Sequence, residues 1–159
     1  MSVTVRRAAL ADVPEILRMI RALATYEHQP EAVEATEASL RAILFGDDPS
    51  VFAHIAELAG RPVGIAVWFL NFSTWTGRHG IYLEDLFVEP DVRRAGVARA
   101  LFAALAREAK RLGCARIDWA VLDWNELAMD FYRRVGGGRS VGWQPWRLDG
   151  EALERLAEG

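Results

Sequence analysis

The stretch from residue 88 to residue 101 has the residue types and spacing best suited to binding an anion. An apolar segment ends, a turn follows, and a long amphipathic segment begins at Gly96. A helix that begins there presents unpaired N–H groups and partial positive charge, which together attract phosphate. Arg93, Arg94 and Arg99 add formal charge around the same point. The pattern predicts a phosphate-binding loop, and a solvated basic patch at an ordinary helix start is the alternative.

Two well-known nucleotide-binding motifs are missing from this loop. It lacks the Gly-Lys-Ser/Thr sequence that ends the phosphate loop of nucleotide hydrolases. Of the three glycines in the dinucleotide-binding pattern, only Gly96 is present. We therefore expect a phosphate-bearing ligand of another kind.

Two carboxylates, Glu84 and Asp85, lie side by side in the otherwise apolar segment Ile81–Val88. Neighbouring residues of a strand face opposite sides of its sheet, so at least one of the two faces an interior or a cleft. A buried carboxylate without a partner is costly. The pair therefore indicates either a ligand site or a structural ion pair with an arginine.

The composition is typical of one folded domain over residues 1–159, with 52% hydrophobic and 26% charged residues. A net charge of -3 argues against a nucleic-acid-binding surface, and the longest apolar run, Val63–Leu70, is too short to cross a membrane. The histidines are scattered and Cys114 is the only cysteine, so we expect neither a metal site nor an internal disulfide. With no signal-peptide pattern in the first residues, these features predict a cytoplasmic protein.

Periodicity and turn residues predict the elements that position these groups. The segment Gly96–Leu112 is expected to be a helix that connects two parallel strands in a right-handed crossover. Hairpins dominate elsewhere, so we expect an α/β fold with a central mixed, mostly antiparallel sheet flanked by helices. The other expected strands are Val3–Arg6, Val51–Leu58, Val63–Leu70, Ile81–Val88, Ala115–Leu122 and at least one within Arg139–Leu148; the other helices run from the cap Asp12 to Leu23, over Thr36–Phe45 and over Asp123–Val135.

The loop Arg93-x-x-Gly96-x-Ala98 resembles the pyrophosphate-binding signature of the GNAT superfamily of acyl-CoA N-acyltransferases, Gln/Arg-x-x-Gly-x-Gly/Ala. Further segments are similar to its diamine acetyltransferase branch, the spermidine/spermine and thialysine acetyltransferases. The resemblance covers nearly the whole chain, and the order and spacing of the segments are more specific than the loop alone. Those segments are Ala24–Glu27, Tyr82–Val88, Trp124–Glu126, Phe131–Arg134 and Trp146–Leu148.

The resemblance implies a GNAT-like sheet that splays between the strands before and after the crossover helix, with acetyl-CoA as the co-substrate in the gap. The backbone of Leu86, Phe87 and Val88 would pair with the pantetheine amides like an added strand. The loop after this strand would wrap the pyrophosphate. Its members are Arg93, Arg94, Ala95, Gly96, Val97, Ala98 and Arg99.

Tyr132 is the candidate proton donor. Asn125, Ala128 and Tyr132 are spaced i, i+3 and i+7 and so share one helix face; the resemblance implies that all three contact the cofactor. Attack of an amine on a thioester expels a thiolate whose conjugate acid has a pKa near ~8.5, against ~10 for tyrosine, so a positioned phenol need only assist. A half-buried tyrosine with no such role is the alternative.

The resemblance also gives Glu84 the task of holding the ammonium of a small-molecule acceptor and taking its proton, directly or through water. Gln144 stands where polyamine enzymes carry an acidic residue, which weakens the case for a long polyamine and leaves room for a thialysine-like amine. Direct transfer in a ternary complex is expected, since Cys114 has no histidine nearby to activate it. The other substrate-side candidates are Tyr26, Glu27, Asp85, Trp75, Asp118, Trp119 and Ala120.

Two other interpretations stay open. The acceptor can instead be a protein amino group, or the domain can be a non-catalytic acyl-CoA sensor. Glu84 and Tyr132 argue against the sensor, which needs neither. Because relatives of this branch form homodimers, we expect a homodimer in which Trp146–Leu148 contributes to the interface.

Overall fold

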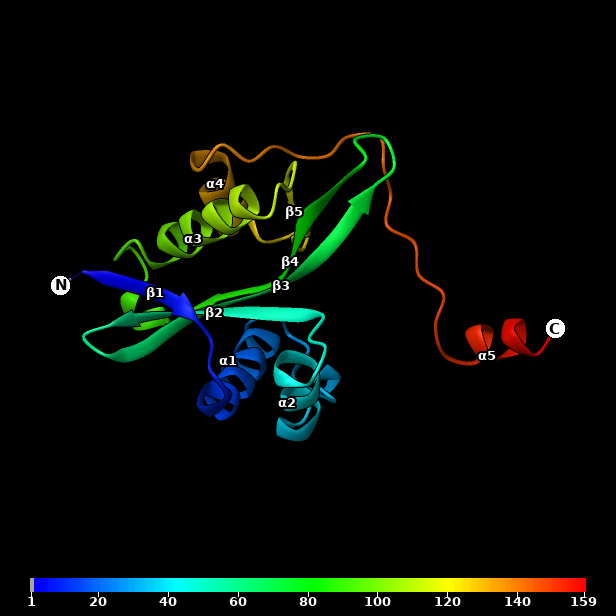
Figure 1. Cartoon of the computed structure of the whole chain (residues 1–159), viewed down its shortest axis with the longest axis horizontal. Coiled ribbons are helices and arrows are strands. Elements are labelled where there is room, and N and C mark those ends of the chain that lie inside the picture. The colour runs from blue at the N-terminus through cyan, green and yellow to red at the C-terminus, as the bar shows by residue number, and fades with distance from the viewer. Residues whose placement is uncertain (1) are drawn as a thin grey trace. The chain divides into compact units, whose positions relative to one another are not determined.

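The computed structural model describes residues 2–159, which divide into two compact units. The first unit extends to Trp124 and holds a five-stranded sheet with helices on both faces (Figure 1). The second unit spans Asn125–Gly159 and holds two helices. The single domain expected over residues 1–159 stays a prediction.

The sheet has the order β1-β2-β3-β4-β5, so each strand lies beside its neighbour in the sequence. β1 to β4 pair antiparallel, whereas β5 pairs parallel with β4 after a helical crossover. The predicted mixed, mostly antiparallel sheet is confirmed. The strands are β1 (Val3–Arg7), β2 (Val51–Leu58), β3 (Arg61–Ser73), β4 (Arg78–Val88) and β5 (Ile117–Trp119).

Helices cover both faces of this sheet. α1 (Val13–Tyr26) and α2 (Glu37–Phe45) lie on one face, and α3 (Val97–Arg111) lies on the other (Figure 1). Among residues 2–159, no helix is both long enough and apolar enough to span a membrane. Single 3-10 turns occur at Leu10–Asp12, Pro30–Ala32 and Pro90–Val92.

A side-chain hydrogen bond caps α2, whereas the predicted cap of α1 is used in the turn before that helix. Thr36 caps α2, because its Oγ1 accepts a hydrogen bond from the Ser39 N–H at 3.1 Å. Asp12, the predicted cap of α1, makes no such bond to that helix. Its carboxylate instead accepts hydrogen bonds from the Ala9 N–H and from the Arg6 guanidinium, both at 2.7 Å, and so closes the 3-10 turn before α1.

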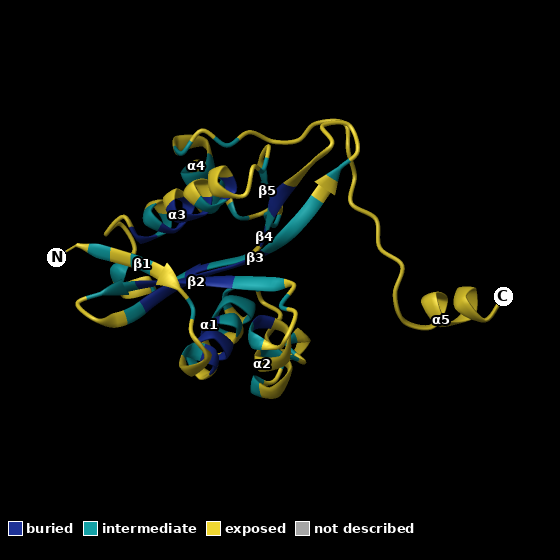
Figure 2. Ribbon diagram, in the orientation of Figure 1, coloured by how far each residue is buried: buried dark blue, intermediate teal, exposed yellow. Residues whose placement is uncertain are grey.

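The core lies between the sheet and the helices. Leu101 and Leu105 of α3 are fully buried against one face of the sheet. Figure 2 shows that burial is concentrated in the strands and in the helix sides that face them. The cluster on the α1 and α2 side consists of Ile16, Met19, Leu44, Ala53, Ile55, Ile65, Val67 and Phe87.

β4 and β5 pair only over a short stretch, Ile81–Leu83 with Ile117–Trp119. β4 continues to Val88 and stays paired with β3, but in the described chain it has no strand partner on the β5 side beyond Leu83. The predicted splay is therefore present, and the predicted strand Ala115–Leu122 is shorter than expected. The backbone from Glu84 to Val88 is left open along one edge.

A β-bulge in β4 falls at Glu84. Asp85 pairs with Val67 of β3 and Leu83 pairs with Trp68, so Glu84 is the extra residue. Directly paired side chains of antiparallel strands share a face. Val67 belongs to the core cluster beneath α1, so Asp85 lies on the α1 face, and Leu83 lies with Trp68 on the other. The bulge thus turns Asp85 away from the face of Leu83.

The second unit contains α4 (Glu126–Arg134) and α5 (Gly150–Glu158). The prediction of a strand within Arg139–Leu148 is wrong, because this segment has no regular structure and all its residues are exposed. Gly142 has a φ of 92°, outside the strand region, and Pro145 has no N–H to donate to a ladder. Within the unit, no neighbouring strand pairs with the segment.

Candidate active site

The predicted phosphate loop lies between the end of β4 and the start of α3. It makes a tight turn, in which the Ala95 N–H donates to the Val92 carbonyl at 3.1 Å. Arg94 and Gly96 have positive φ angles of 80° and 79°. Such an angle is uncommon outside glycine, so Arg94 holds a strained backbone of the kind found at functional sites. A Cβ on Gly96 would meet nothing within 4 Å, so this side of the loop is open.

The first turn of α3 offers donors for an anion. Within residues 2–159, the N–H groups of Val97, Ala98 and Arg99 have no protein acceptor, and α3 has no side-chain cap. Arg94 and Arg99 form no salt bridge in that part of the chain either. Free N–H groups, two unpaired guanidinium groups and the open side of Gly96 fit a pyrophosphate.

Gly64 of β3 sets how closely α3 approaches the sheet. A Cβ at this position would lie 2.9 Å from the Phe87 carbonyl oxygen and 3.1 Å from a methyl group of Val97. Only glycine allows this approach. Val97 is 2% exposed, so the first turn of the helix is seated firmly on β3 and β4.

Two ion pairs hold the turn before α3. Arg18 of α1 pairs with Glu89, and Arg61 at the start of β3 pairs with Asp91 at 2.7 Å. Both acidic residues of the turn are thereby neutralised. The positive charge of the loop arginines is left for a ligand.

The β4 residues predicted to pair with a pantetheine arm are ordered by β3. Leu86, Phe87 and Val88 pair with Ala66, Ile65 and Gly64 along one edge and are open along the other. The Phe87 side chain is buried in the cluster beneath α1, which fixes the strand in place.

Three carboxylates interact beside the open edge of β4. Glu84 is exposed at the bulge, whereas Asp85 is partly buried. The pKa of Asp85 is raised to about 6, first by burial and then by the negative charges of Glu84 and Glu27. Burial also raises the pKa of Glu27. No salt bridge reaches Glu84 or Asp85 within residues 2–159, so neither carboxylate belongs to a structural ion pair with an arginine there. A cation placed among these carboxylates would relieve their repulsion.

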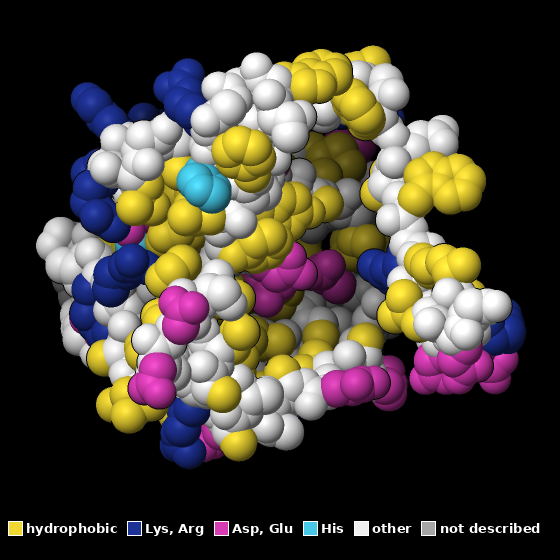
Figure 3. Space-filling model, turned by 45° about the vertical axis from the view of Figure 1, so that its right-hand side comes forward, with side chains coloured by type: hydrophobic (Ala, Val, Ile, Leu, Met, Phe, Trp, Pro, Cys, Tyr) yellow, Lys and Arg dark blue, Asp and Glu magenta, His cyan; other side chains and the backbone are white. Residues whose placement is uncertain are grey.

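Aromatic side chains and an arginine lie at the end of α1, beside Glu27. Figure 3 shows Asp and Glu side chains gathered near the centre of one face, among hydrophobic side chains. At the end of α1, the ring of Tyr26 lies with its centre 6.0 Å from that of Trp124. The Arg93 guanidinium of the phosphate loop lies over the Tyr26 ring, 4.9 Å from its centre. Residues from both predicted sites therefore meet at Tyr26.

Other substrate-side candidates are more dispersed. Asp118 of β5 accepts a hydrogen bond from Arg116 at 2.9 Å, so its charge is already paired. Trp119 packs edge-on against Phe102 of α3, with ring centres 5.2 Å apart. Ala120 is exposed just beyond β5, and Trp75 lies in the β3–β4 turn with 86% of its surface exposed.

The second unit holds the remaining candidates. Asn125 caps α4, since its Oδ1 accepts a hydrogen bond from the Ala128 N–H at 3.2 Å. Tyr132 is half-buried, and its ring meets that of Phe131 at an edge, 5.7 Å between centres. Gln144 lines a shallow hollow of the irregular segment together with Arg139, Gly142, Trp143 and Trp146.

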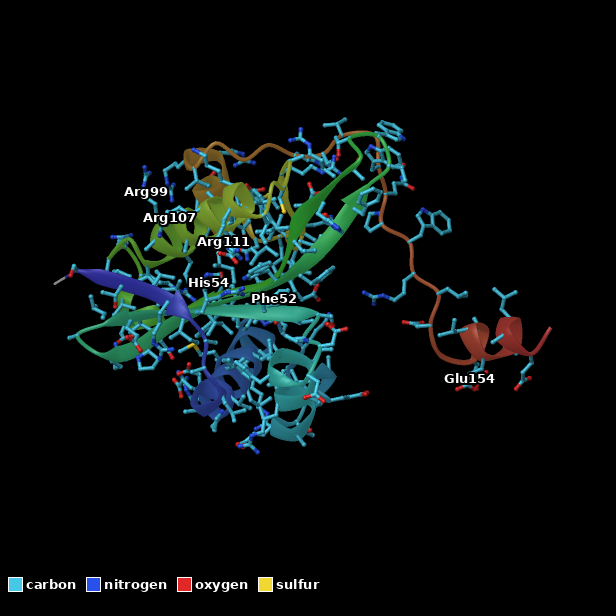
Figure 4. All side chains as sticks on the ribbon, in the orientation of Figure 1. Phe52, His54, Arg99, Arg107, Arg111 and Glu154 are labelled. Atoms are coloured by element: carbon cyan, nitrogen blue, oxygen red, sulfur yellow. The ribbon has the colours of Figure 1, made fainter. Side chains whose placement is uncertain are left out.

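One buried titratable side chain lies outside this constellation. His54 of β2 accepts a hydrogen bond from Trp68 Nε1 at 3.0 Å, and burial lowers its pKa to about 4. His54 lies on β2 beside Phe52, apart from Arg99 at the start of α3 (Figure 4). We therefore assign it to the packing of the sheet. Within residues 2–159, no three His, Cys, Asp or Glu side chains come together as a metal site would need.

Besides the bulge at Glu84, two further features of this site were not predicted from the sequence. Gly64, an isolated glycine inside an apolar strand, carried a signal for close backbone approach. No sequence signal predicts that Arg93 lies over Tyr26. The two residues are 67 positions apart, and no spacing rule connects them.

Comparison with known proteins identifies the family. Residues 13–137 match the model of the Acetyltransferase (GNAT) family. A thialysine N-epsilon-acetyltransferase of Sus scrofa is 39% identical over 98% of this chain and 98% of that protein. An L-ornithine N5-acetyltransferase of Arabidopsis thaliana is 26% identical over 96% of this chain and 86% of that protein. Among solved structures, an integron cassette protein from the mobile metagenome of V. cholerae superposes with a TM-score of 0.82, at 25% identity, over 100% of this chain and 99% of that one.

The fold agrees with this match. The splayed sheet, the open turn at Gly96 and the helix that follows it all lie within the residues that the family model covers. The chain belongs to the GNAT family of acetyltransferases, and it is an acetyltransferase enzyme.

Proposed function

We propose that this enzyme transfers an acetyl group from acetyl-CoA to a primary amine of a small cationic molecule. The observation that carries the proposal is the acidic group of Glu27, Glu84 and Asp85 beside the open edge of β4, with Arg93 of the phosphate loop close by on Tyr26. One end of this surface suits an anion and the other suits an ammonium.

The loop from Arg93 to Arg99 holds the pyrophosphate in this proposal. The N–H groups of Val97, Ala98 and Arg99 donate to phosphate oxygens, and the guanidinium groups of Arg93, Arg94 and Arg99 surround them. Ala95 and Gly96 let the backbone come close. Leu86, Phe87 and Val88 pair through their backbone with the amides of the pantetheine arm. Bound in this way, the co-substrate supplies an acetyl group activated as a thioester.

Glu84 takes the proton of the acceptor ammonium, directly or through water. Its exposure at the bulge gives it access to a ligand. Asp85 and Glu27 attract the cation and hold it beside Glu84. The freed amine lone pair then forms the new C–N bond at the acetyl carbon while the C–S bond breaks, and the nitrogen releases its second proton to solvent to give the neutral amide. Both substrates are bound together in a ternary complex that supplies proximity.

Tyr132 gives its proton to the departing thiolate in this proposal. The Asn125 cap fixes the start of α4, and with it the rotation of the helix face that carries Ala128 and Tyr132. Asn125 and Ala128 contact the co-substrate on the same face. General acid assistance of this kind contributes about 10²–10⁴-fold to the rate.

The relatives favour a diamino acid as the acceptor. The names of the similar proteins specify thialysine and L-ornithine. Both are amino acids with a primary amine at the end of the side chain. Gln144, in place of an acidic residue, fits a shorter and less cationic substrate than a polyamine. Tyr26, Trp75, Asp118, Trp119 and Ala120 are the further substrate-side candidates.

We also propose a homodimer in the cytoplasm. Residues 138–159 are all exposed, including Trp143 at 71% and Trp146 at 90%. Large apolar side chains exposed in one short segment indicate a partner surface, and a second copy is the partner we propose. A single cysteine, Cys114, is compatible with a reducing compartment. Light scattering after size exclusion tests the dimer; a monomer for the unaltered protein contradicts it.

A thiol-release assay tests the proposed function. Each reaction contains purified enzyme, acetyl-CoA and one acceptor. The acceptors are thialysine, L-ornithine, spermidine and a peptide with a free N-terminus. We expect the highest kcat/KM with thialysine or L-ornithine. Acetylation of the peptide alone contradicts the small-amine proposal, and tight CoA binding without turnover on any acceptor contradicts the proposed catalytic roles.

A further inference from the structure

Arg93 lies where the two halves of the proposed site meet. It belongs to the phosphate loop by sequence, yet its guanidinium lies over the ring of Tyr26, 4.9 Å from the ring centre. A guanidinium has five N–H donors, so it can bind a phosphate oxygen without leaving the ring. Within residues 2–159, neither Arg94 nor Arg99 lies over an aromatic ring in this way.

Tyr26 is the last residue of α1, and its ring also lies near a second aromatic ring. Its ring centre lies 6.0 Å from that of Trp124, and the Trp124 ring also meets His28, at 5.2 Å. The chain turns sharply here, since His28 has a φ of 62°. A change in the position of Tyr26 is therefore transmitted to the residue between it and His28, which is Glu27.

Glu27 belongs to the acidic group. It is half-buried, and its charge contributes to the raised pKa of Asp85. The phosphate loop is thus linked to the acidic group in three steps: Arg93 lies over Tyr26, Glu27 follows Tyr26 in the chain, and the charge of Glu27 acts on Asp85.

We infer that Arg93 is a positioning residue that couples the two substrate sites, so that an anion bound at the loop fixes Tyr26 and Glu27 and tightens the binding of the amine. The inference rests on the proposed function. An anion immobilises the guanidinium, which restricts the ring beneath it and the acidic residue next in the chain. A ligand that binds an already ordered site loses less conformational entropy. Because coupling is reciprocal, the amine must raise the affinity for CoA by the same factor.

Calorimetry on the full chain tests this coupling. CoA is titrated into the enzyme alone and into the enzyme saturated with L-ornithine or with thialysine; CoA carries no acetyl group, so no reaction occurs. We expect the Kd of CoA to fall at least about fivefold with the amine present, and the reverse titration to give the same factor. A CoA Kd that neither amine changes overturns the inference.

Four variants distinguish a positioning role of Arg93 from the general effect of positive charge in the loop. Tyr26→Leu and Arg93→Met should reduce the coupling factor to about one, whereas Tyr26→Phe keeps the ring and should restore it. Arg94→Met is the matched control: it removes a charge from the same loop without touching Tyr26, so it should weaken CoA binding and leave the coupling factor unchanged. Full coupling in Tyr26→Leu, or equal loss in Arg94→Met, overturns the role of Arg93. Thiol release with the unaltered enzyme is measured separately, so failure of the proposed function is distinguished from failure of the coupling.

Discussion

Glu84 and Asp85 are neighbours in β4, but the bulge at Glu84 leaves Glu84 exposed and turns Asp85 onto the buried α1 face. In a regular strand Asp85 would lie on the face of Leu83, away from Glu27. The bulge therefore creates the acidic group, because it brings the Asp85 carboxylate within electrostatic reach of Glu27.

The pH dependence of the reaction follows from Asp85. Its carboxylate must be ionised to attract an ammonium, and its pKa is about 6. We expect kcat/KM for the amine to fall about tenfold per pH unit below that value. In Asp85→Asn this acidic limb should disappear and the KM for the amine should rise, while Glu84→Gln should mainly lower kcat. An unchanged limb in Asp85→Asn contradicts the assignment.

The raised pKa of Asp85 also affects the stability of the fold. The pKa of Asp85 in the folded chain lies above its ordinary 3.8, so the unfolded chain loses this proton more readily. Ionisation between pH 4 and pH 6 therefore disfavours the fold, and the penalty remains at higher pH. Asp85→Asn should raise the free energy of unfolding at pH 7.5 by about 1–2 kcal/mol, allowing for the partial exposure of the side chain. Denaturant unfolding of both proteins at pH 7.5 and pH 4 measures the difference in their free energies of unfolding. The extra stability of Asp85→Asn should vanish at pH 4.

Two glycines shape the phosphate site, and each predicts a loss of co-substrate affinity. Gly64→Ala places a Cβ 2.9 Å from the Phe87 carbonyl oxygen and 3.1 Å from Val97, which must displace the start of α3. Gly96→Val forces a β-branched residue into a φ of 79° and fills the open side of the loop. We expect the Kd of CoA to rise at least about tenfold in both, as measured by calorimetry. Gly138→Ala, whose Cβ meets nothing within 4 Å, is the control and should bind normally.

Tyr132→Phe tests the proton donor. The phenyl ring keeps the edge contact with Phe131, at 5.7 Å between ring centres in the unaltered protein, so α4 should stay folded. We expect kcat to fall about 10²–10⁴-fold and the Kd of CoA to stay nearly the same. Steady-state kinetics measures kcat, and calorimetry measures the Kd of CoA as the control. Equal kcat in variant and parent excludes the role.

Periodicity was sufficient for α1 to α4, because these helices follow short-range patterns, but it did not predict α5 (Gly150–Glu158). The splay of the sheet was expected from the resemblance to the GNAT superfamily and not from periodicity. The loop at Gly96 was predicted from a short-range pattern, as were α1 to α4. The bulge at Glu84 could not be predicted. It arises from the register of β4 against β3, which no local pattern around Glu84 reveals. The strand expected within Arg139–Leu148 failed because alternating apolar residues need a neighbouring strand, and within its own unit this segment has none.

Initial velocities with both substrates varied distinguish direct acetyl transfer to a small amine in a ternary complex from transfer through an acetylated enzyme. With thialysine as the acceptor, we predict double-reciprocal lines that intersect, because both substrates must be bound before the C–S bond breaks. Parallel lines would contradict it, since they indicate an acetylated enzyme as an intermediate. Cys114, whose thiol pKa is raised by burial, is poorly suited to that route.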